Sequence, residues 1–205
     1  MVYKTLTKAL LIASMSIGLS SGVCAADAPK LKMGASDTML AFTCVGCHGN
    51  NGASNGPAIP TIAGLSNEYF IEVMKGYAAG TVPATIMDRI AKGYTEDEIK
   101  QLASFFVSKT FVKAKQEFDP KLVKAGGKLH DKYCEKCHAE GGQSAEDDAG
   151  VLAGQWTPYV MNMFDDFNSG RREAPKKMAK QMKNMMAKEG EAGLHALSSY
   201  YASQQ

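Results

Sequence analysis

The sequence predicts an all-α fold built from two similar domains in tandem. Its apolar residues recur at the spacing of amphipathic helices, and alternating runs typical of strands are absent from the sequence. The chain also repeats itself, because Cys44, His48 and Gly64 each have a matching residue 90 positions later. Of its 205 residues, 45% are hydrophobic and 21% charged, which is typical of a folded chain rather than a disordered one.

Three helices are expected in the first half. The first covers Thr38 to Cys47, and the second covers Asn67 to Tyr77. Apolar side chains of the second segment share one helical face: Tyr69, Phe70, Val73, Met74 and Tyr77. The third helix begins after Thr95, because Thr95 followed by Glu98 three residues later is a capping box.

The second half has a similar helical pattern. A helix over Lys121 to Tyr133 leads into the second cysteine pair. Thr157 followed by Pro158 indicates an N-cap with proline at the first helical position. Two further helices are expected over Pro175 to Lys188 and over Gly193 to Ser203.

The first 26 residues have the pattern of a cleaved secretory signal peptide. Lys4 and Lys8 precede an apolar stretch from Leu10 to Val23, and small residues follow it. We therefore expect a signal peptide over residues 1–26, a first domain over 27–112, a linker over 113–120 and a second domain over 121–205. Cleavage of such a signal places the mature chain in the periplasm.

The charge balance disfavours one class of function. Without Lys4 and Lys8, the remaining 21 basic residues equal the 21 acidic ones. Nucleic-acid binding needs a basic footprint, so this near-neutral chain disfavours it. Beyond the signal, no segment is apolar enough to predict a membrane span.

Two short motifs carry the chemistry of the chain. They are Cys44-Val45-Gly46-Cys47-His48 and Cys134-Glu135-Lys136-Cys137-His138. The pattern C-x-x-C-H is the attachment signature of c-type haem. Two cysteines three apart on a helical turn can each form a thioether to one porphyrin, and the following histidine then faces the iron. The sequence therefore predicts two covalently attached haem c groups, one in each half.

Other uses of these cysteines fit the sequence less well. A zinc site with four cysteines usually separates its pairs by about 15–20 residues, whereas these pairs start 90 residues apart. Two local disulfides would leave both histidines without a role. A thioredoxin-like redox motif would need a βαβ pattern, which the sequence lacks.

A distal iron ligand is needed in each half, and methionine is a usual choice. Met87 lies in a loop before a short helix, 39 residues after His48, and Met178 lies 40 residues after His138. We expect these two methionines as ligands. The less favoured alternatives are Met74 in the first half, Met182, Met185 and Met186 in the second, and the histidines His130 and His195.

Several residues are expected to support the haems. A ligating histidine usually donates its second ring N–H to a carbonyl, and the Pro60 and Gly150 carbonyls lie at the matching positions. Aromatic candidates for propionate hydrogen bonds, or for plain packing, are Trp156, Tyr69 and Tyr159. The basic cluster Arg171, Arg172, Lys176 and Lys177 is expected either to meet propionates or a partner, or to form a solvated face.

The chain resembles the dihaem class I cytochromes c, and in particular the cytochrome subunits of flavocytochrome c sulfide dehydrogenases. Four segments carry the resemblance: Thr85 to Tyr94, Lys128 to His138, Leu152 to Tyr159, and Tyr200 to Gln205. It implies that both haems are attached through C-x-x-C-H and ligated by histidine and methionine. The match places the distal role on Met87 and Met178. A departure occurs at residues 171–174, where members of the family can carry another methionine.

The resemblance implies an electron-transfer subunit rather than an enzyme. Its partner would be an FAD-containing subunit that oxidises sulfide and carries the only FAD, and its acceptor would be a soluble carrier such as another cytochrome c. We expect the first domain to dock on that subunit through apolar loops at residues 55–65 and 78–87. A free-standing dihaem carrier of the cytochrome c4 type and, less favoured, a dihaem peroxidase remain the alternatives.

Overall fold

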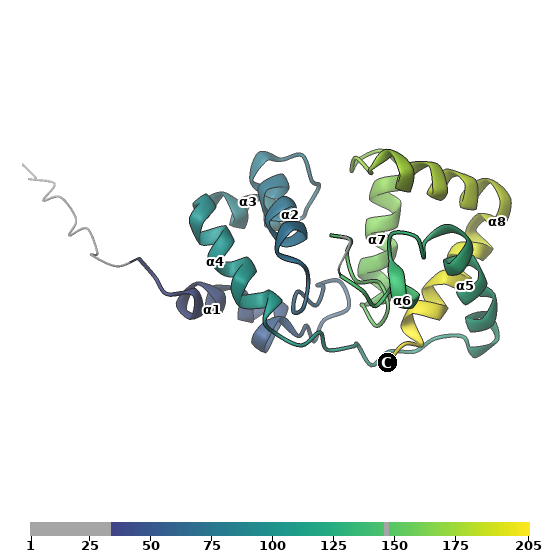
Figure 1. The fold of residues 1–205 in the computed structure, drawn as a ribbon, viewed down its shortest axis with the longest axis horizontal. Helices are drawn as coiled ribbons and strands as arrows, with labels where there is room; N and C mark the ends of the chain where they lie inside the picture. Colours follow the sequence, from purple (N-terminus) through teal and green to yellow (C-terminus); the bar gives the residue numbers. More distant parts are fainter. Residues whose placement is uncertain (1–33, 146–147) are drawn as a thin grey trace, which may run out of the picture. The chain divides into compact units, whose positions relative to one another are not determined.

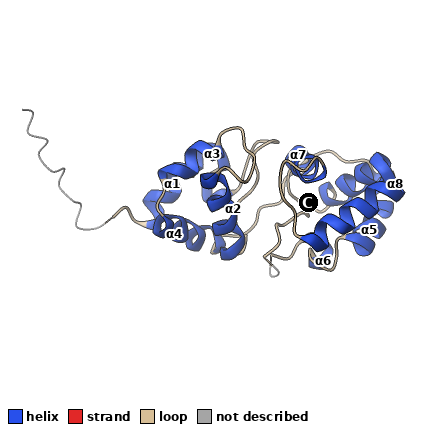
Figure 2. Ribbon diagram, turned by 90° about the horizontal axis from the view of Figure 1, so that it is seen from above, coloured by secondary structure: helices blue, strands red, loops and turns tan. Residues whose placement is uncertain are grey.

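The computed structural model describes residues 34–145 and 148–205, and the part from Ala35 onward forms one compact unit. The regular elements of this part are helices, with no strand among the described residues (Figure 2). Figure 1 shows α1 to α4 in one group and α5 to α8 in another. The predicted all-α class is therefore confirmed for these residues. The predicted signal peptide lies outside them.

The first group contains four α-helices and two 3₁₀ turns. They are α1 (Asp37–His48), η1 (Asn50–Gly52), α2 (Asn67–Ala79), α3 (Met87–Ile90), η2 (Ala91–Gly93) and α4 (Glu96–Val107). The hydroxyls of Ser36, Ser66 and Thr95 cap the starts of α1, α2 and α4. The predicted capping box is present, because the Glu98 side chain also accepts from the Thr95 backbone.

The core of the first group lies between α1, α2 and α4. Its large buried side chains are Leu40, Phe70, Met74, Ile99, Leu102 and Phe106. Leu40 comes from α1. The phenyl rings of Phe70 and Phe106 stack on each other, with centroids 5.8 Å apart. This core fixes α1, and α1 ends in the first cysteine–histidine motif.

The second group is built around two long helices. Its elements are α5 (Pro120–Tyr133), α6 (Ala139–Gly142), α7 (Thr157–Asn168) and α8 (Lys176–Ala202). Packing of α5 on α8 is its most extensive helix contact. The buried residues Tyr133, Met185, Leu197 and Tyr201 form its core. Pro120, which the sequence assigns to the linker, is instead the first residue of α5.

Two details of the helices differ from the sequence prediction. Thr157 is the first residue of α7 rather than its cap; Trp156 takes the cap position, and no side chain caps the helix. The two helices expected before and after residue 190 form one element, α8, interrupted at Gly190. Gly190 has φ 59° and ψ −155°, a combination open to glycine and costly for other residues, so the helix axis breaks there.

The repeat seen in the sequence is also a repeat of backbone structure. Gly52 and Gly142 have φ 82° and 88°, values that favour glycine. The carbonyl of Gly52 accepts from Ile62 N at 2.8 Å, and that of Gly142 accepts from Leu152 N at 2.9 Å. Each bond closes a loop that returns the chain toward the histidine of its own half.

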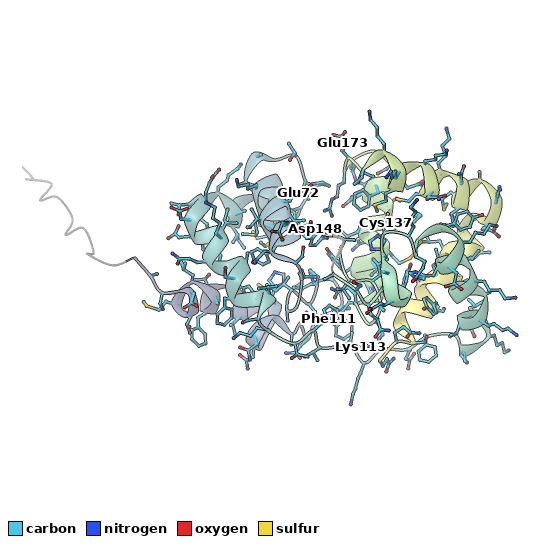
Figure 3. The ribbon with its side chains drawn as sticks, in the orientation of Figure 1. Glu72, Phe111, Lys113, Cys137, Asp148 and Glu173 are labelled. Carbon is cyan, nitrogen blue, oxygen red and sulfur yellow. The ribbon has the colours of Figure 1, made fainter. Side chains whose placement is uncertain are left out.

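A non-helical segment, residues 110–119, connects the two groups. Phe111 packs against Gly64 of the first group, and Ala114 N donates to Gly154 O of the second at 2.7 Å. Lys113 Nζ also donates to the Gln143 side chain at 2.8 Å (Figure 3 labels Phe111 and Lys113). The segment is therefore bonded to both groups along its length.

Candidate haem-binding sites

The first cysteine–histidine motif forms the last turn of α1. Cys44 is half-buried, Cys47 is exposed and His48 is buried with 8% of its surface exposed. Neither cysteine is in a disulfide, so both sulfur atoms are available for thioether attachment. The helix ends directly after His48 because Gly49 takes φ 73°. The motif thus presents two thiols and an imidazole from a single helical turn.

The imidazole of His48 is oriented by the backbone of the following loop. Its Nδ1 lies 2.9 Å from the carbonyl oxygen of Pro60, which confirms the predicted acceptor. Burial lowers the pKa of His48, although the bond to Pro60 opposes that shift. In a neutral ring that donates through Nδ1, the lone pair of Nε2 remains available to bind iron.

The second motif makes the same histidine-to-carbonyl hydrogen bond, but its local backbone structure differs. Cys134 to His138 form a turn after α5 instead of the end of a helix. His138 Nδ1 lies 3.0 Å from the Gly150 carbonyl oxygen, as predicted. Burial lowers the pKa of His138 as well, so this ring too is neutral with Nε2 available. Cys137 is exposed and is labelled in Figure 3.

The methionines divide into core residues and candidates for the iron. Met74 and Met185, with 6% and 2% of their surfaces exposed, belong to the two hydrophobic cores. Met87 is the first residue of α3 and Met178 lies in the first turn of α8. Both are half-buried, so their thioethers are less enclosed by the cores than those of Met74 and Met185. These matching places favour Met87 and Met178, whose role as ligands stays a prediction.

The two remaining histidines are poorer candidates for the iron than the methionines. His130 is completely buried, with Nδ1 2.9 Å from the Tyr201 hydroxyl and Nε2 2.6 Å from a Glu135 carboxylate oxygen. Both of its ring nitrogens are therefore already bonded. His195 lies on the exposed side of α8. The His130 network was not expected from the sequence, which gives no direct sign of it.

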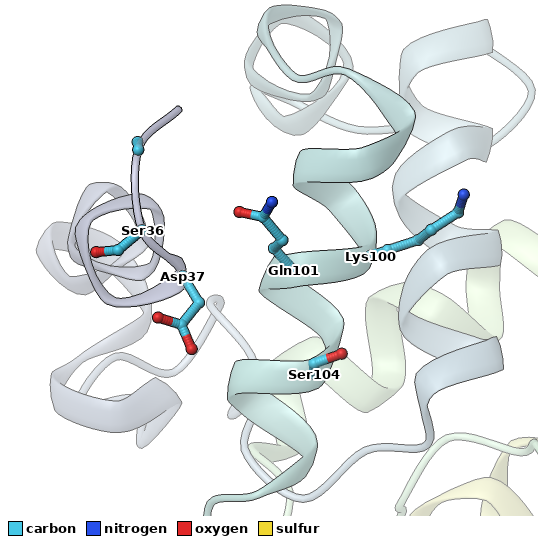
Figure 4. A pocket seen from close by; sticks show the side chains of 6 residues that line it. Ser36, Asp37, Lys100, Gln101 and Ser104 are labelled. Atoms are coloured by element: carbon cyan, nitrogen blue, oxygen red, sulfur yellow. The ribbon is translucent and has the colours of Figure 1, made fainter. Parts of the chain in front are cut away.

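The donor atoms fit haem better than a bare metal ion. Among the described residues, no group of three or more His, Cys, Asp or Glu side chains could hold a metal ion. A hollow between α1 and α4, lined by Asp37, Lys100 and Gln101 among others, contains none of the predicted ligands (Figure 4). The histidines are neutral and singly oriented, which suits axial ligation of a porphyrin iron.

Comparison with known proteins places this arrangement in a family. No protein-family model matches the chain. The cytochrome c4 of Azotobacter vinelandii is 31% identical over 179 residues, which are 78% of this chain and 83% of that relative. The chain belongs to the cytochrome c4 family. Reduced cytochrome c4 from Pseudomonas stutzeri has the same fold, with a TM-score of 0.68, 25% identity, and coverage of 83% of this chain and 98% of that one.

Membership of the cytochrome c4 family confirms two predictions at once. The fold is a pair of class I cytochrome domains, and the cofactors are two covalently attached haem c groups. A second relative is the cytochrome subunit of sulfide dehydrogenase from Chlorobaculum tepidum. It is 37% identical over 97 residues, 47% of this chain and 87% of that subunit. This similarity covers half of the chain, whereas the cytochrome c4 similarity spans most of it.

The aromatic candidates take part in contacts between the two halves of this cytochrome. Trp156 Nε1 donates to the Ser54 carbonyl at 3.2 Å. The Tyr69 hydroxyl hydrogen-bonds Tyr159, and it lies where a β-carbon on Gly150 would approach to 2.9 Å. The polar groups of all three rings therefore have hydrogen-bond partners within the protein, at the contact between the two halves.

The basic cluster is largely paired within its own half. Arg171 forms ion pairs with Asp165 at 2.6 Å and with Asp166 at 2.7 Å. The Arg172 guanidinium is mostly buried over the Phe167 ring, 4.7 Å from its centroid. Lys176 and Lys177 are exposed at the start of α8. Of the four, only these two lysines present charge mainly to solvent.

Two residues that the sequence did not single out join the halves near His48. The backbone N–H of Thr61 donates to Gln155 Oε1, and Gln155 Nε2 donates to Thr61 O, both at 2.9 Å. The only sequence sign is a mismatch in the repeat, because Gln155 corresponds to Leu65.

Among the described residues, no helix is long and apolar enough to cross a membrane.

Proposed function

We propose that this chain is a periplasmic dihaem electron carrier that takes electrons from an FAD-containing, sulfide-oxidising subunit and passes them to a soluble carrier. The observation that carries the electron-transfer role is the equivalence of His48 and His138. Each donates through Nδ1 to a carbonyl and offers Nε2 to iron. The bound haem supplies the one-electron chemistry, and the chain sets its position and potential.

The ligand set completes this role. Cys44 and Cys47 hold the first haem and Cys134 and Cys137 the second, with His48 and His138 as proximal ligands. Met87 and Met178 are the distal ligands in this proposal. An iron with both axial positions filled by protein has no place for a substrate, so it exchanges electrons only. This argues against a peroxidase, which needs an open position on one iron.

The sulfide-oxidising partner is supported by the four sequence segments and by the relative from Chlorobaculum tepidum. The free-standing carrier remains a second candidate, and a specific observation favours it. The cytochrome c4 of Azotobacter vinelandii matches both halves of the chain, whereas the sulfide dehydrogenase subunit matches the length of one. The two candidates differ only in whether a flavoprotein binds permanently.

The surface for such a partner is proposed on the first half. Ile86 and Ile90, beside Met87, are 46% and 39% exposed, which is high for isoleucine. In the loop at 78–87, Val82 packs instead on Gly76 of α2. A near-neutral chain gives little basis for charge steering, so a permanent complex is expected to rest on apolar burial.

Purification from the native source tests the partner. The proposal expects a yellow flavoprotein to co-purify and to remain bound at high salt, because apolar contacts are not screened. Ile86→Asp should release it with both haems retained. Val107→Asp, at an apolar position on α4 that is 39% exposed, is the control and should leave the complex intact. A cytochrome that purifies alone in low and high salt would support the free-standing carrier.

A second experiment separates an electron carrier from an enzyme. Carbon monoxide binds ferrous haem only where an axial position is open or easily vacated. The ferrous spectrum of the native cytochrome is therefore expected to stay unchanged under carbon monoxide. A change without denaturant would favour the peroxidase alternative.

A further inference from the structure

Gln155 of the second half is bonded to the loop that orients the haem ligand of the first half. Its side-chain oxygen accepts from Thr61 N and its side-chain nitrogen donates to Thr61 O, each at 2.9 Å. Gln155 is 2% exposed and Thr61 is 1% exposed. The orientation of the amide is fixed, because a backbone N–H can only donate and a carbonyl can only accept.

One of the two bonded atoms, Thr61 N, belongs to the same peptide group as the carbonyl that accepts from His48. The Thr61 N–H and the Pro60 carbonyl are the two ends of one planar peptide unit. The Pro60 oxygen lies 2.9 Å from His48 Nδ1. A continuous chain of bonds therefore runs from Gln155 through this peptide to the imidazole of His48.

We infer that Gln155 is a positioning residue for His48 and lowers the reduction potential of the first haem from across the contact between the two halves. The inference rests on the proposed role of His48 as an iron ligand. When a side chain accepts a hydrogen bond from the N–H of a peptide, the negative partial charge on the carbonyl oxygen of that same peptide increases. A stronger acceptor for Nδ1–H makes the imidazole a more basic ligand, which favours ferric iron.

The second half lacks this support. By the repeat, Val151 corresponds to Thr61 and Leu65 corresponds to Gln155. Leu65 is buried but apolar, so it cannot accept from a backbone N–H. Among the described residues, no side chain bonds the Val151 N–H. The two haems are thus expected to differ in potential although their histidines have the same carbonyl bond.

Thr61 is also held in place by bonds that a Gln155 variant would leave untouched. Its hydroxyl accepts from Ser54 N at 3.3 Å and donates to the Val112 carbonyl at 3.4 Å. Loss of the Gln155 bonds should therefore weaken the polarisation of the Pro60–Thr61 peptide without removing the loop from its place.

The test compares Gln155→Met with Gln116→Met in the holoprotein. Methionine keeps the side-chain length but cannot make either backbone bond. Gln116 is a matched control, because its amide also bonds backbone at both ends, to Gln155 O at 2.7 Å and Thr157 N at 2.9 Å. Neither bond touches the peptide that His48 uses. Both variants should lower the melting temperature to a similar degree.

The readouts are a redox titration and the NMR shift of the His48 Nδ1 proton in the ferrous state. For Gln155→Met, one of the two potentials should rise, and the His48 proton should move upfield as its bond weakens. Gln116→Met should change neither. Unchanged potentials in Gln155→Met, or equal shifts in both variants, would overturn the inference. If His48 does not ligate iron at all, the NMR signal of an iron-bound His48 would be missing, and this would refute the proposed function.

Gln155→Glu covers the case in which the methionine variant does not take up both haems. At this buried position a protonated glutamate keeps its carbonyl oxygen toward Thr61 N–H and donates its hydroxyl to Thr61 O, so both bonds are preserved. The first-haem potential should then stay at its native value or fall below it. A rise in Gln155→Glu would contradict the inference as directly as no change in Gln155→Met.

Discussion

The two loops that orient His48 and His138 have the same backbone bonds but different side-chain support. In the first half the Pro60 carbonyl accepts from His48, and Gln155 bonds the other end of that peptide. In the second half the Gly150 carbonyl accepts from His138, and no described side chain bonds the matching N–H. The repeated backbone thus explains why both halves hold a haem. Side chains that are not repeated are the basis on which we expect the two haems to differ in potential.

The cores behind the two motifs differ in a similar way. Leu40 packs as an apolar side chain in α1, whereas His130, at the matching position of α5, is buried with bonds to Tyr201 and Glu135. The Glu135 carboxylate also accepts from the backbone N–H groups of Glu140 and Gly141. A polar network therefore replaces part of the apolar core and fixes the turn that carries the second motif.

The largest expected effect comes from removing the distal ligands one at a time. Met87→Ala and Met178→Ala should each abolish half of the weak long-wavelength absorption that marks iron–methionine bonding. Each should also lower one of the two potentials, because methionine ligation raises the potential. Optical redox titration of both variants measures this, and the equivalence of the halves predicts that they behave alike.

Met74→Leu and Met185→Leu are the controls for that experiment. Both methionines are core residues, so these swaps should change stability by less than about 1.5 kcal/mol and leave both spectra intact. If Met74→Leu removed the absorption and Met87→Ala did not, the ligand assignment of the first half would be wrong.

Much of this structure could be predicted from the sequence because it depends on local or repeated signals. The helices, the capping box at Thr95 and the carbonyl acceptors at Pro60 and Gly150 all follow from short patterns. The sequence predicts Thr157 as the N-cap of its helix, and this is wrong because the residue before it, Trp156, takes the cap conformation without a side-chain bond. Helix boundaries of this kind depend on tertiary contacts that propensity does not contain.

The long-range polar contacts could not be predicted from the sequence. Gln155 meets Thr61 across 94 residues of chain, and His130 meets Tyr201 across 71. No spacing rule links such residues, and only the mismatches in the repeat, Leu65 against Gln155 and Leu40 against His130, hint at them. A repeat with one polar and one apolar partner at matching buried positions is therefore a useful place to look for specialisation.

The next largest effect is expected from filling the repeated glycines. Gly52→Ala would place its β-carbon 2.9 Å from both Ala63 N and Phe106, in addition to an unfavourable positive φ. Roughly 1–2 kcal/mol from the backbone and about 1–3 kcal/mol from the clash should add up in the free energy of unfolding. Denaturant titration should show a smaller loss for Gly142→Ala, whose nearest contact is 3.1 Å.

Gly80→Ala separates the two contributions. Gly80 also has a positive φ, 72°, but a β-carbon there would meet nothing within 4 Å. Its loss should therefore be the backbone part alone, about 1–2 kcal/mol. Equal losses for Gly52→Ala and Gly80→Ala would mean that the loop of the first half is not tightly closed on Gly52.

A smaller effect, dependent on pH, is expected at Glu135. The hydrogen bond from His130, and then that from Gly141 N–H, lower the pKa of the Glu135 carboxyl. A lowered folded-state pKa means that its stabilisation is present above the ordinary value of about 4.3 and is lost as the pH falls through the lowered value. Glu135→Gln should therefore lower the melting temperature at neutral pH and make little difference in strong acid.

Glu72→Gln is the control for the acid experiment. Glu72 is exposed on α2, and its carboxylate makes no hydrogen bond among the described residues (Figure 3 labels it). Melting curves of this variant should follow the native protein at every pH. A Glu135→Gln curve that runs parallel to the native one down to strong acid would contradict the role of the His130 network.

The smallest effect is expected from Pro60→Ala. The second half shows that the carbonyl bond forms without proline, because Gly150 takes the same place. The variant should therefore keep both potentials and lose about 0.4–1 kcal/mol of stability, since proline restricts the unfolded chain. A clear shift of one potential would show that the ring of Pro60, and not only its carbonyl, positions His48.

Both haems are expected to be six-coordinate with the same pair of ligand types, and near-infrared magnetic circular dichroism of the oxidised native protein tests this most directly. The band of histidine–methionine ligation should have the intensity of two such irons per chain, with no signal from an iron that lacks a protein ligand. A band with the intensity of only one such iron, or a signal from an iron open to solvent, would show that the halves differ in ligation and would contradict the proposed ligand sets.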